Sequence, residues 1–394
     1  MNKNNLIKKI TAFVFLTLLF IWSMKNSLFT ALANIFNYLG QSGTEALSEQ
    51  TLEEEYTDLV GGQKMLINLN GAAAALLNMQ GLYSNMGMYI TEEKYIVSAS
   101  DFTSTDYEYS ETVDLKNFLT ENGIQLLYVN EPTKYTDDSL FSKSFGVESY
   151  SNRNMDRFLE RIRAEGIKTV DIRENMAEEG LDAFSLFYRT DHHWTVPAAL
   201  WATQKIAAGL NEYCGYDIDT SIYDRSNFTE KEWKNCWLGE QGRKVAESYV
   251  GLDDYTELKP DFETSFTFKN SDGSRWDGNF DDFINEEIYN TENDVYENGS
   301  WHYSYSRINC INNRVEKGKI LILGDSYDYL THPFLALGVR EVDSLILREY
   351  DDSFSLRDYI LENGYDTVII AYAQFMLGAH DDPTSANYRM YTFE

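Results

Sequence analysis

Residues 319–327 read Lys-Ile-Leu-Ile-Leu-Gly-Asp-Ser-Tyr, an apolar run that ends in a Gly-Asp-Ser turn. A short, continuous apolar run bounded by turn residues is typical of a strand that is buried on both faces. Gly324 permits a tight turn, and the residues from Ser326 onward have a helical pattern. The stretch therefore predicts a buried strand followed at once by a helix.

The same alternation of strand and helix recurs on both sides of this stretch. Strands are predicted at residues 124–129, 167–172, 342–347 and 365–372, and helices at residues 113–121, 155–164 and 355–363. Because continuous apolar strands signal a parallel sheet covered on both faces, the sequence predicts a three-layer α/β fold.

Two regions differ from this α/β pattern. Residues 214–318 are polar and rich in Asn, Asp and aromatic side chains, and they read as an insertion of strands and loops at about these positions. Residues 33–85 read as a helical stalk. The body of the fold is therefore expected in residues 86–394.

The N-terminus has the pattern of an export segment. Lys3, Lys8 and Lys9 precede residues 10–24, which carry no charge. This run is short for a bilayer span of roughly 20 residues, so residues 1–32 read either as a cleaved signal peptide or as an uncleaved membrane anchor. In both cases the body is expected outside the cytoplasm, either anchored to the cell membrane by a single N-terminal span or secreted.

Charge and cysteine content exclude other classes. The chain of 394 residues has 33 Lys and Arg against 63 Asp and Glu, a net charge of −30. Nucleic-acid binding needs clustered basic residues, so no nucleic-acid partner is expected. The three cysteines show neither a disulfide framework nor a zinc-binding spacing.

The segment Asp191-His192-His193-Trp194 precedes a predicted helix over about residues 196–213, which Thr195 can cap. In an extended segment, Asp191 and His193 point to the same side, so the carboxylate can orient the imidazole as a general base. Two alternatives remain: a metal site at His192 and His193, or packing beside Trp194. Since no third ligand stands at a recognisable spacing, no metal or other cofactor is expected.

The turn after the strand at residues 319–323 would raise the Ser326 hydroxyl above the edge of the sheet, at the start of a helix that favours an oxyanion. With Asp191 and His193 on the same sheet, a nucleophile, a base and an orienting acid come together.

At these residues the chain resembles the DHHW family and, more widely, the SGNH-hydrolase-like alginate O-acetyltransferases. Those proteins have an Asp-x-His element that is followed later by Gly-Asp-Ser, and this sequence shares that order. The resemblance covers roughly residues 85–375 and includes shorter matches at residues 130–135, 237–244, 253–255 and 259–264.

The resemblance implies an SGNH-like sheet with Ser326 as the acyl-accepting nucleophile, His193 as the base and Asp191 as the orienting acid. It implies O-acetyl groups of an extracellular polysaccharide as the substrate, and a membrane-bound partner protein that delivers the acyl group. The Gly-x-Asn-Asp block of common SGNH esterases is absent here. The oxyanion hole beyond the Ser326 backbone N–H is therefore not defined by the family pattern.

Five further residues are candidates for oxyanion or substrate contact: Gly324, Tyr327, Lys134, Arg243 and His192. For Lys134 and Arg243, salt bridges to the many surrounding carboxylates are an equal alternative.

The sequence thus favours a cell-envelope acyltransferase that acetylates a polysaccharide acceptor through Ser326, His193 and Asp191. An extracellular carbohydrate esterase with the same triad and a non-catalytic glycan-binding surface protein are the alternatives.

Overall fold

The computed structural model describes residues 63–270, 272–297, 301–351, 353–378 and 388–394. The chain divides into two compact units, residues 1–73 and residues 74–394. In the first unit, the described part belongs to helix α4 (Gln63–Leu76). The predicted export segment and residues 33–62 of the predicted stalk lie outside the described residues. No helix among the described residues is long and apolar enough to cross a membrane.

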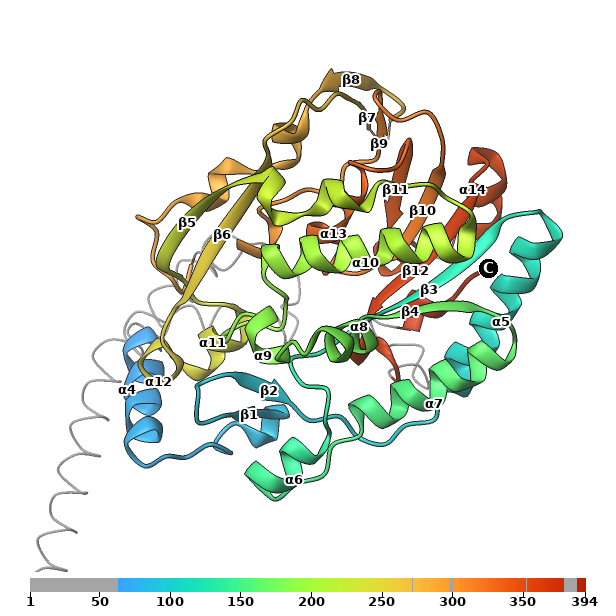
Figure 1. Cartoon of the computed structure of the whole chain (residues 1–394). Helices are drawn as coiled ribbons and strands as arrows, with labels where there is room; N and C mark the ends of the chain where they lie inside the picture. Colours follow the sequence, from blue (N-terminus) through green and yellow to red (C-terminus); the bar gives the residue numbers. More distant parts are fainter. Residues whose placement is uncertain (1–62, 271, 298–300, 352, 379–387) are drawn as a thin grey trace, which may run out of the picture. The chain divides into compact units, whose positions relative to one another are not determined.

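An eight-stranded mixed sheet forms the centre of the second unit (Figure 1). Neighbouring strands within the first part of the sheet are parallel, in the order β4 (Lys168–Asp171), β3 (Gln125–Glu131), β12 (Thr367–Ala373), β10 (Lys319–Gly324) and β11 (Glu341–Leu345). Every residue of β12 is buried. These strands match the predicted runs to within a few residues.

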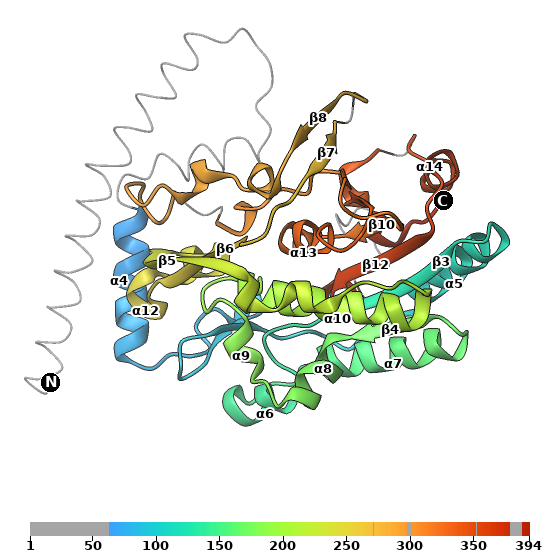
Figure 2. The same cartoon turned by 45° about the horizontal axis from the view of Figure 1, so that its top comes forward.

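The sheet continues beyond β11, so the expectation of a purely parallel sheet was wrong. Strands β9 (Cys310–Asn312), β7 (Phe266–Lys269) and β8 (Arg275–Gly278) are added antiparallel to their neighbours. The physical reason is the edge of β11, whose backbone groups would otherwise lack partners on that side. Figure 2 shows β7 and β8 as a hairpin at the end of the sheet away from β3 and β4.

Helices cover both faces of the sheet because alternate residues of its strands point to opposite sides. On one face, Ile320 and Ile322 pack in the same core as helices α10 (Val196–Cys214) and α13 (Asp328–Leu335). On the other, Leu321 and Leu323 pack with α5 (Asp106–Glu121), α7 (Ser151–Ala164) and α14 (Leu356–Asn363). The fold is therefore a three-layer α/β structure, and Figure 1 shows α10 running across the strands.

The remaining strands and α-helices lie outside the eight-stranded sheet. A separate antiparallel pair is formed by β5 (Phe228–Trp237) and β6 (Asp253–Pro260), and another by β1 (Met88–Ile90) and β2 (Ile96–Ser98). The other helices are α6 (Ser139–Phe145), α8 (Ile172–Glu179), α9 (Ala183–Leu186), α11 (Glu240–Val245) and α12 (Glu247–Val250). The predicted insertion thus contains β5 to β9. Rather than being only carried on the sheet, it supplies three strands of the sheet.

Candidate active site

The Gly-Asp-Ser turn follows β10 and is held in place by Asp325. Its Oδ1 accepts a hydrogen bond from the Tyr327 backbone N–H at 2.8 Å, and its Oδ2 accepts one from the Ala373 N–H at 2.7 Å. Because Asp325 holds the turn, α13 begins at Asp328 rather than at Ser326. Gly324 is required for space, since a Cβ there would lie 2.8 Å from the Cβ of Asp328. The Ser326 residue is 8% exposed.

The segment that carries the histidines enters α10 as predicted. Thr195 caps the helix by accepting a hydrogen bond from the Ala198 N–H, and Gly215 ends it in the left-handed conformation. The prediction that residues 191–193 are extended was wrong, because Asp191 Oδ1 accepts a hydrogen bond from the His193 backbone N–H at 3.1 Å. This is the turn that an Asp side chain commonly forms with the backbone two residues on.

His193 lies within hydrogen-bonding distance of both Asp191 and Ser326. His193 Nδ1 is 2.5 Å from Asp191 Oδ1, and His193 Nε2 is 2.9 Å from Ser326 Oγ. An ionised carboxylate only accepts hydrogen bonds, so Nδ1 donates to Asp191 and Nε2 is left to accept from the serine hydroxyl. The arrangement has the geometry of a nucleophile activated by a base that a carboxylate orients.

Asp191 is completely buried, and residues from beyond β5 contribute to its surroundings. Its Oδ2 accepts a hydrogen bond from the Glu240 N–H at 2.8 Å. Gly239 allows this approach, since a Cβ there would lie 2.4 Å from the Cβ of Asp191. Burial raises the pKa of Asp191, but the electrostatic interaction and hydrogen bond with His193 outweigh it and hold the pKa well below its usual range. Asp191 is therefore ionised at neutral pH.

The side chain of His192 lies against that of His193, which an extended segment would not allow. The two imidazole rings are 4.1 Å apart. Burial, with a smaller effect of the nearby His193, lowers the pKa of His192 to about 4, so its ring is neutral at pH 7. Tyr327 donates a hydrogen bond from its hydroxyl to the His192 carbonyl at 2.5 Å and thereby connects the two motifs.

His302, which sequence reasoning left aside, also belongs to the site. Its ring stacks on that of His193 at 4.4 Å with an interplanar angle of 15°. Burial, with a smaller effect of His193, lowers the pKa of His302 to about 3. It comes from the short helix Trp301–Tyr303 in the predicted insertion, and no sequence pattern around it signals this role.

In the described part of the chain, one group of side chains is close enough together to ligate a metal ion. It consists of Asp191, His193 and His302, whose ligand atoms lie within 4.8 Å of one another. Both ring nitrogens of His193 are, however, already engaged by Asp191 and Ser326. A metal ion at this position would have to replace one of these two hydrogen bonds.

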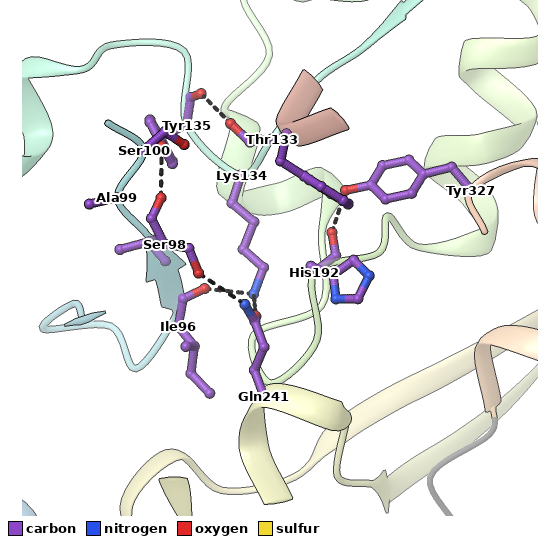
Figure 3. Close-up of a pocket in the computed structure, with 12 residues that line it drawn as sticks. Ile96, Ser98, Ala99, Ser100, Thr133, Lys134, Tyr135, His192, Gln241 and Tyr327 are labelled. Carbon is purple, nitrogen blue, oxygen red and sulfur yellow. Dashed lines mark hydrogen bonds between the residues drawn. The ribbon is translucent and has the colours of Figure 1, made fainter. Parts of the chain in front are cut away.

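Lys134 is buried beside the same loop (Figure 3). Its Nζ donates hydrogen bonds to the carbonyl oxygens of Ile96 at 2.8 Å and Arg189 at 3.1 Å, and to Gln241 Oε1 at 3.3 Å. Burial lowers the pKa of Lys134 to about 7, although Asp191 and Asp253 oppose the shift. These three acceptors match the three N–H groups of an ammonium, so Lys134 ties the Arg189 backbone to β2 and α11.

Arg243 is half-buried in α11, and its Nε has no hydrogen-bond partner among the described residues. Its positive charge contributes to the lowered pKa of His302, after burial and His193. Within the described residues, neither Arg243 nor Lys134 forms an ion pair with a carboxylate at 4.0 Å or less. The salt-bridge alternative from the sequence therefore does not describe these two side chains.

Glu131, at the end of β3, lies within the match at residues 130–135, but the sequence assigned it no role. It is completely buried, and its two carboxylate oxygens have no hydrogen-bond partner in the described structure. Burial, with smaller effects of Asp325 and Asp328, raises the pKa of Glu131 well above its usual range. A protonated carboxylic acid therefore lies close to the turn that carries Ser326.

Part of the chain matches a model of a known protein family. Residues 88–233 match the model of the SGNH hydrolase-like domain of the acetyltransferase AlgX. No curated protein matches the chain significantly.

Solved structures with the same fold include Bacillus cereus PatB1, which is 19% identical with a TM-score of 0.60 over 77% of this chain and 99% of that chain. A second PatB1 structure carries a sulfonyl adduct. A DHHW family protein from Eubacterium siraeum is 16% identical, with a TM-score of 0.54 over 73% of this chain and 89% of that chain. The resemblance of this chain to the DHHW and SGNH hydrolase-like acetyltransferase proteins, expected from its motifs, is thereby confirmed, and residues 88–233 match the AlgX family.

Proposed function

We propose that this protein is a cell-envelope O-acetyltransferase that moves acetyl groups onto an extracellular or cell-wall polysaccharide, with Ser326 as the nucleophile. The observation that carries the proposal is the 2.9 Å contact between His193 Nε2 and Ser326 Oγ, with Asp191 on the other ring nitrogen. The match to an acetyltransferase family model supports the choice of acyl transfer.

The proposed reaction has two halves. His193 Nε2 takes the Ser326 proton while Oγ attacks the carbonyl carbon of an acetyl ester, and the collapse of the adduct breaks the bond between the acyl carbon and the donor oxygen. His193 returns the proton to the leaving oxygen, which leaves an acetyl-serine. In the second half, His193 deprotonates a sugar hydroxyl, the sugar oxygen attacks the acetyl-serine, and Ser326 regains its proton.

The surroundings of the site fit the charges that this sequence creates. Asp191 remains ionised and stabilises the imidazolium, because the pKa of Asp191 lies well below its usual range. The backbone N–H of Ser326, at the turn that leads into α13, is the oxyanion donor we assign. The rings of His192 and His302, which lie beside His193, are neutral at pH 7. They therefore add no positive charge that would oppose proton transfer to His193.

The predicted export segment supports an extracytoplasmic location, anchored to the membrane or released from it. In that location a membrane-bound partner protein would deliver the acyl group, and the polysaccharide would be the acceptor. The uncharged run over residues 10–24 supports this location.

The experiment labels the protein with phenylmethylsulfonyl fluoride and maps the adduct by mass spectrometry, alongside hydrolysis of a chromogenic acetyl ester. We expect one adduct at Ser326, loss of both signals in Ser326→Ala and His193→Ala, and unchanged signals in Ser144→Ala, a change at an exposed serine of α6. Folded protein that is neither labelled nor active would contradict both the transferase and the esterase.

Adding oligosaccharide acceptors to the ester assay then separates the two enzymes. Acetylated oligosaccharide as the main product supports the transferase, whereas acetate alone in the presence of every acceptor supports the carbohydrate esterase. Glycan binding without labelling or turnover supports the non-catalytic binding protein.

A further inference from the structure

A cavity of about 300 Å³ lies beside the triad and is not used by the chemistry described above. His192 forms part of its wall, and the His192 ring is 4.1 Å from that of His193. The remaining wall comes from β2 and the residues after it, the loop after β3, α11, Tyr327 in the turn before α13, and the residues after β12 (Figure 3). Its volume is at the lower end of the range for small-molecule sites, roughly 300–1,000 Å³.

The cavity lacks the negative charge that dominates the rest of the chain. The chain has 63 Asp and Glu, yet no residue that lines the cavity is acidic. Its one basic residue, Lys134, already directs its N–H groups at three acceptors of the protein. The cavity therefore does not select a cation, and it offers no unpaired charge for a strongly charged ligand.

The polar groups that remain are hydroxyls, an amide and an imidazole, and they belong to Ser98, Ser100, Thr133, Tyr135, Tyr327, Gln241 and His192. Aromatic rings come from Phe375 and the two tyrosines, and Ile96, Val97 and Ala99 add apolar surface. Because the pKa of His192 lies near 4, its ring is neutral at pH 7 and offers one donor and one acceptor. Phe375 lies edge-on to His192 at 5.4 Å and presents an apolar surface.

We propose that this cavity is an acceptor subsite, which binds one sugar ring of the glycan next to the ring whose hydroxyl receives the acetyl group. The inference rests on the proposed acyl transfer and adds the place where the acceptor binds. Sugar rings combine hydroxyls at their edge with C–H groups on their faces. A neutral set of short polar side chains around an aromatic ring complements both.

Binding and turnover are tested with cellotetraose, chitotetraose and an oligomannuronate of the same length as probes. The cavity is filled by Ser100→Phe, at a half-buried position in its wall, and by Ser98→Phe, at an exposed position on its rim. The control is Ser144→Phe, the same change at an exposed position of α6 outside the cavity. Titration calorimetry gives Kd for each probe, and circular dichroism establishes that each variant is folded.

We expect the parent to bind at least one neutral tetrasaccharide, with Kd raised roughly tenfold or more in both filling variants and changed less than about twofold in the control. The kcat/KM for acetyl transfer to that sugar should fall by a larger factor than kcat/KM for the chromogenic ester. A parent that binds none of the probes, or filling variants that bind like the parent, would overturn the subsite.

The outcome for the small ester distinguishes the remaining explanations. If the filling variants slow ester hydrolysis by the same factor as transfer, the cavity holds the acyl donor and the acceptor assignment is wrong. If the parent neither reacts with phenylmethylsulfonyl fluoride nor hydrolyses the ester, yet binds a tetrasaccharide in the cavity, the proposed catalysis fails while the sugar site remains.

Discussion

Replacing Asp191 by Asn is the change that most directly examines the hydrogen-bond arrangement of the site. The carboxylate accepts from His193 Nδ1 and from the His193 backbone N–H through one oxygen, and from the Glu240 N–H through the other. An amide has one accepting oxygen and one donating NH₂ group. In Asp191→Asn, the NH₂ group must therefore face either the His193 donors or the Glu240 N–H, which is also a donor.

Both orientations of the amide damage the site. With the oxygen toward Glu240, the NH₂ group faces His193 Nδ1, so the ring proton moves to Nε2 and the imidazole no longer accepts the Ser326 proton. With the oxygen toward His193, the tautomer is kept, but an N–H is left unsatisfied and the negative charge beside the imidazolium is lost. We expect kcat for the acetyl ester to fall by about 10³–10⁴, or roughly 4–5.5 kcal/mol in activation free energy.

The assay is steady-state hydrolysis of the chromogenic acetyl ester, with the rate of sulfonylation of Ser326 as a second measurement. Asp217→Asn, at an exposed position after α10, is the matched control and should behave like the parent. A folded Asp191→Asn protein whose kcat stays within about tenfold of the parent would refute the reasoning that a buried carboxylate sets the tautomer of His193.

Three more changes have defined outcomes. Gly239→Ala places a Cβ 2.4 Å from that of Asp191, so it should slow ester hydrolysis and lower the free energy of unfolding by roughly 1–3 kcal/mol. The control Gly81→Ala, whose Cβ would have its nearest neighbour at 3.9 Å, should leave the rate unchanged. Equal rates for the two variants would contradict this expectation. Burial raises the pKa of Glu131 in the folded protein, so its contribution to stability is full below pH 4.5 and is lost as the pH rises toward the folded pKa. Glu131→Gln should therefore flatten the fall of the urea midpoint between pH 5 and 8, and an unaltered slope would show that Glu131 is not a protonated group. Burial lowers the pKa of Lys134 to about 7, so the folded protein binds fewer protons than the unfolded chain between pH 7 and 10.5, and stability should rise with pH across that window. Lys134→Met should abolish this rise of stability with pH. Because it leaves carbonyl oxygens unpaired, it should also lower the free energy of unfolding by roughly 1–3 kcal/mol per carbonyl. Urea unfolding at pH 7 and at pH 10 measures both effects.

The sequence predicted the central strands of the sheet because their residues are apolar on both faces, and that pattern is local. β10 and β12 are examples in which almost every residue is buried. β9 was not predicted, since Cys310–Asn312 is three residues long and ends in a polar side chain. Its strand conformation comes from pairing with the edge of β11, which is a contact distant in sequence.

The candidate triad was predicted from residue types and from the spacing of Asp191 and His193, although the local conformation differs from the one assumed. The backbone turns at these residues instead of extending, and the side chains still meet. His302 and Glu131 were missed for another reason. Each reaches the site through the folding of a distant segment. His302 has no neighbours in the sequence that suggest a role, and the match at residues 130–135 pointed to Lys134 rather than to Glu131.

The position of β12 in the sheet has a consequence for how the protein folds. β12 lies between β3 and β10, yet it is the last strand in the described part of the chain. Pairings of such high contact order form slowly, so the two halves of the sheet cannot join until nearly the whole polypeptide has been synthesised. The partial chain would expose unpaired strand edges, which favours aggregation and makes assistance from a chaperone valuable. The serine and the imidazole would then meet only in the finished molecule, so a nascent chain would lack the proposed acyl-transfer activity.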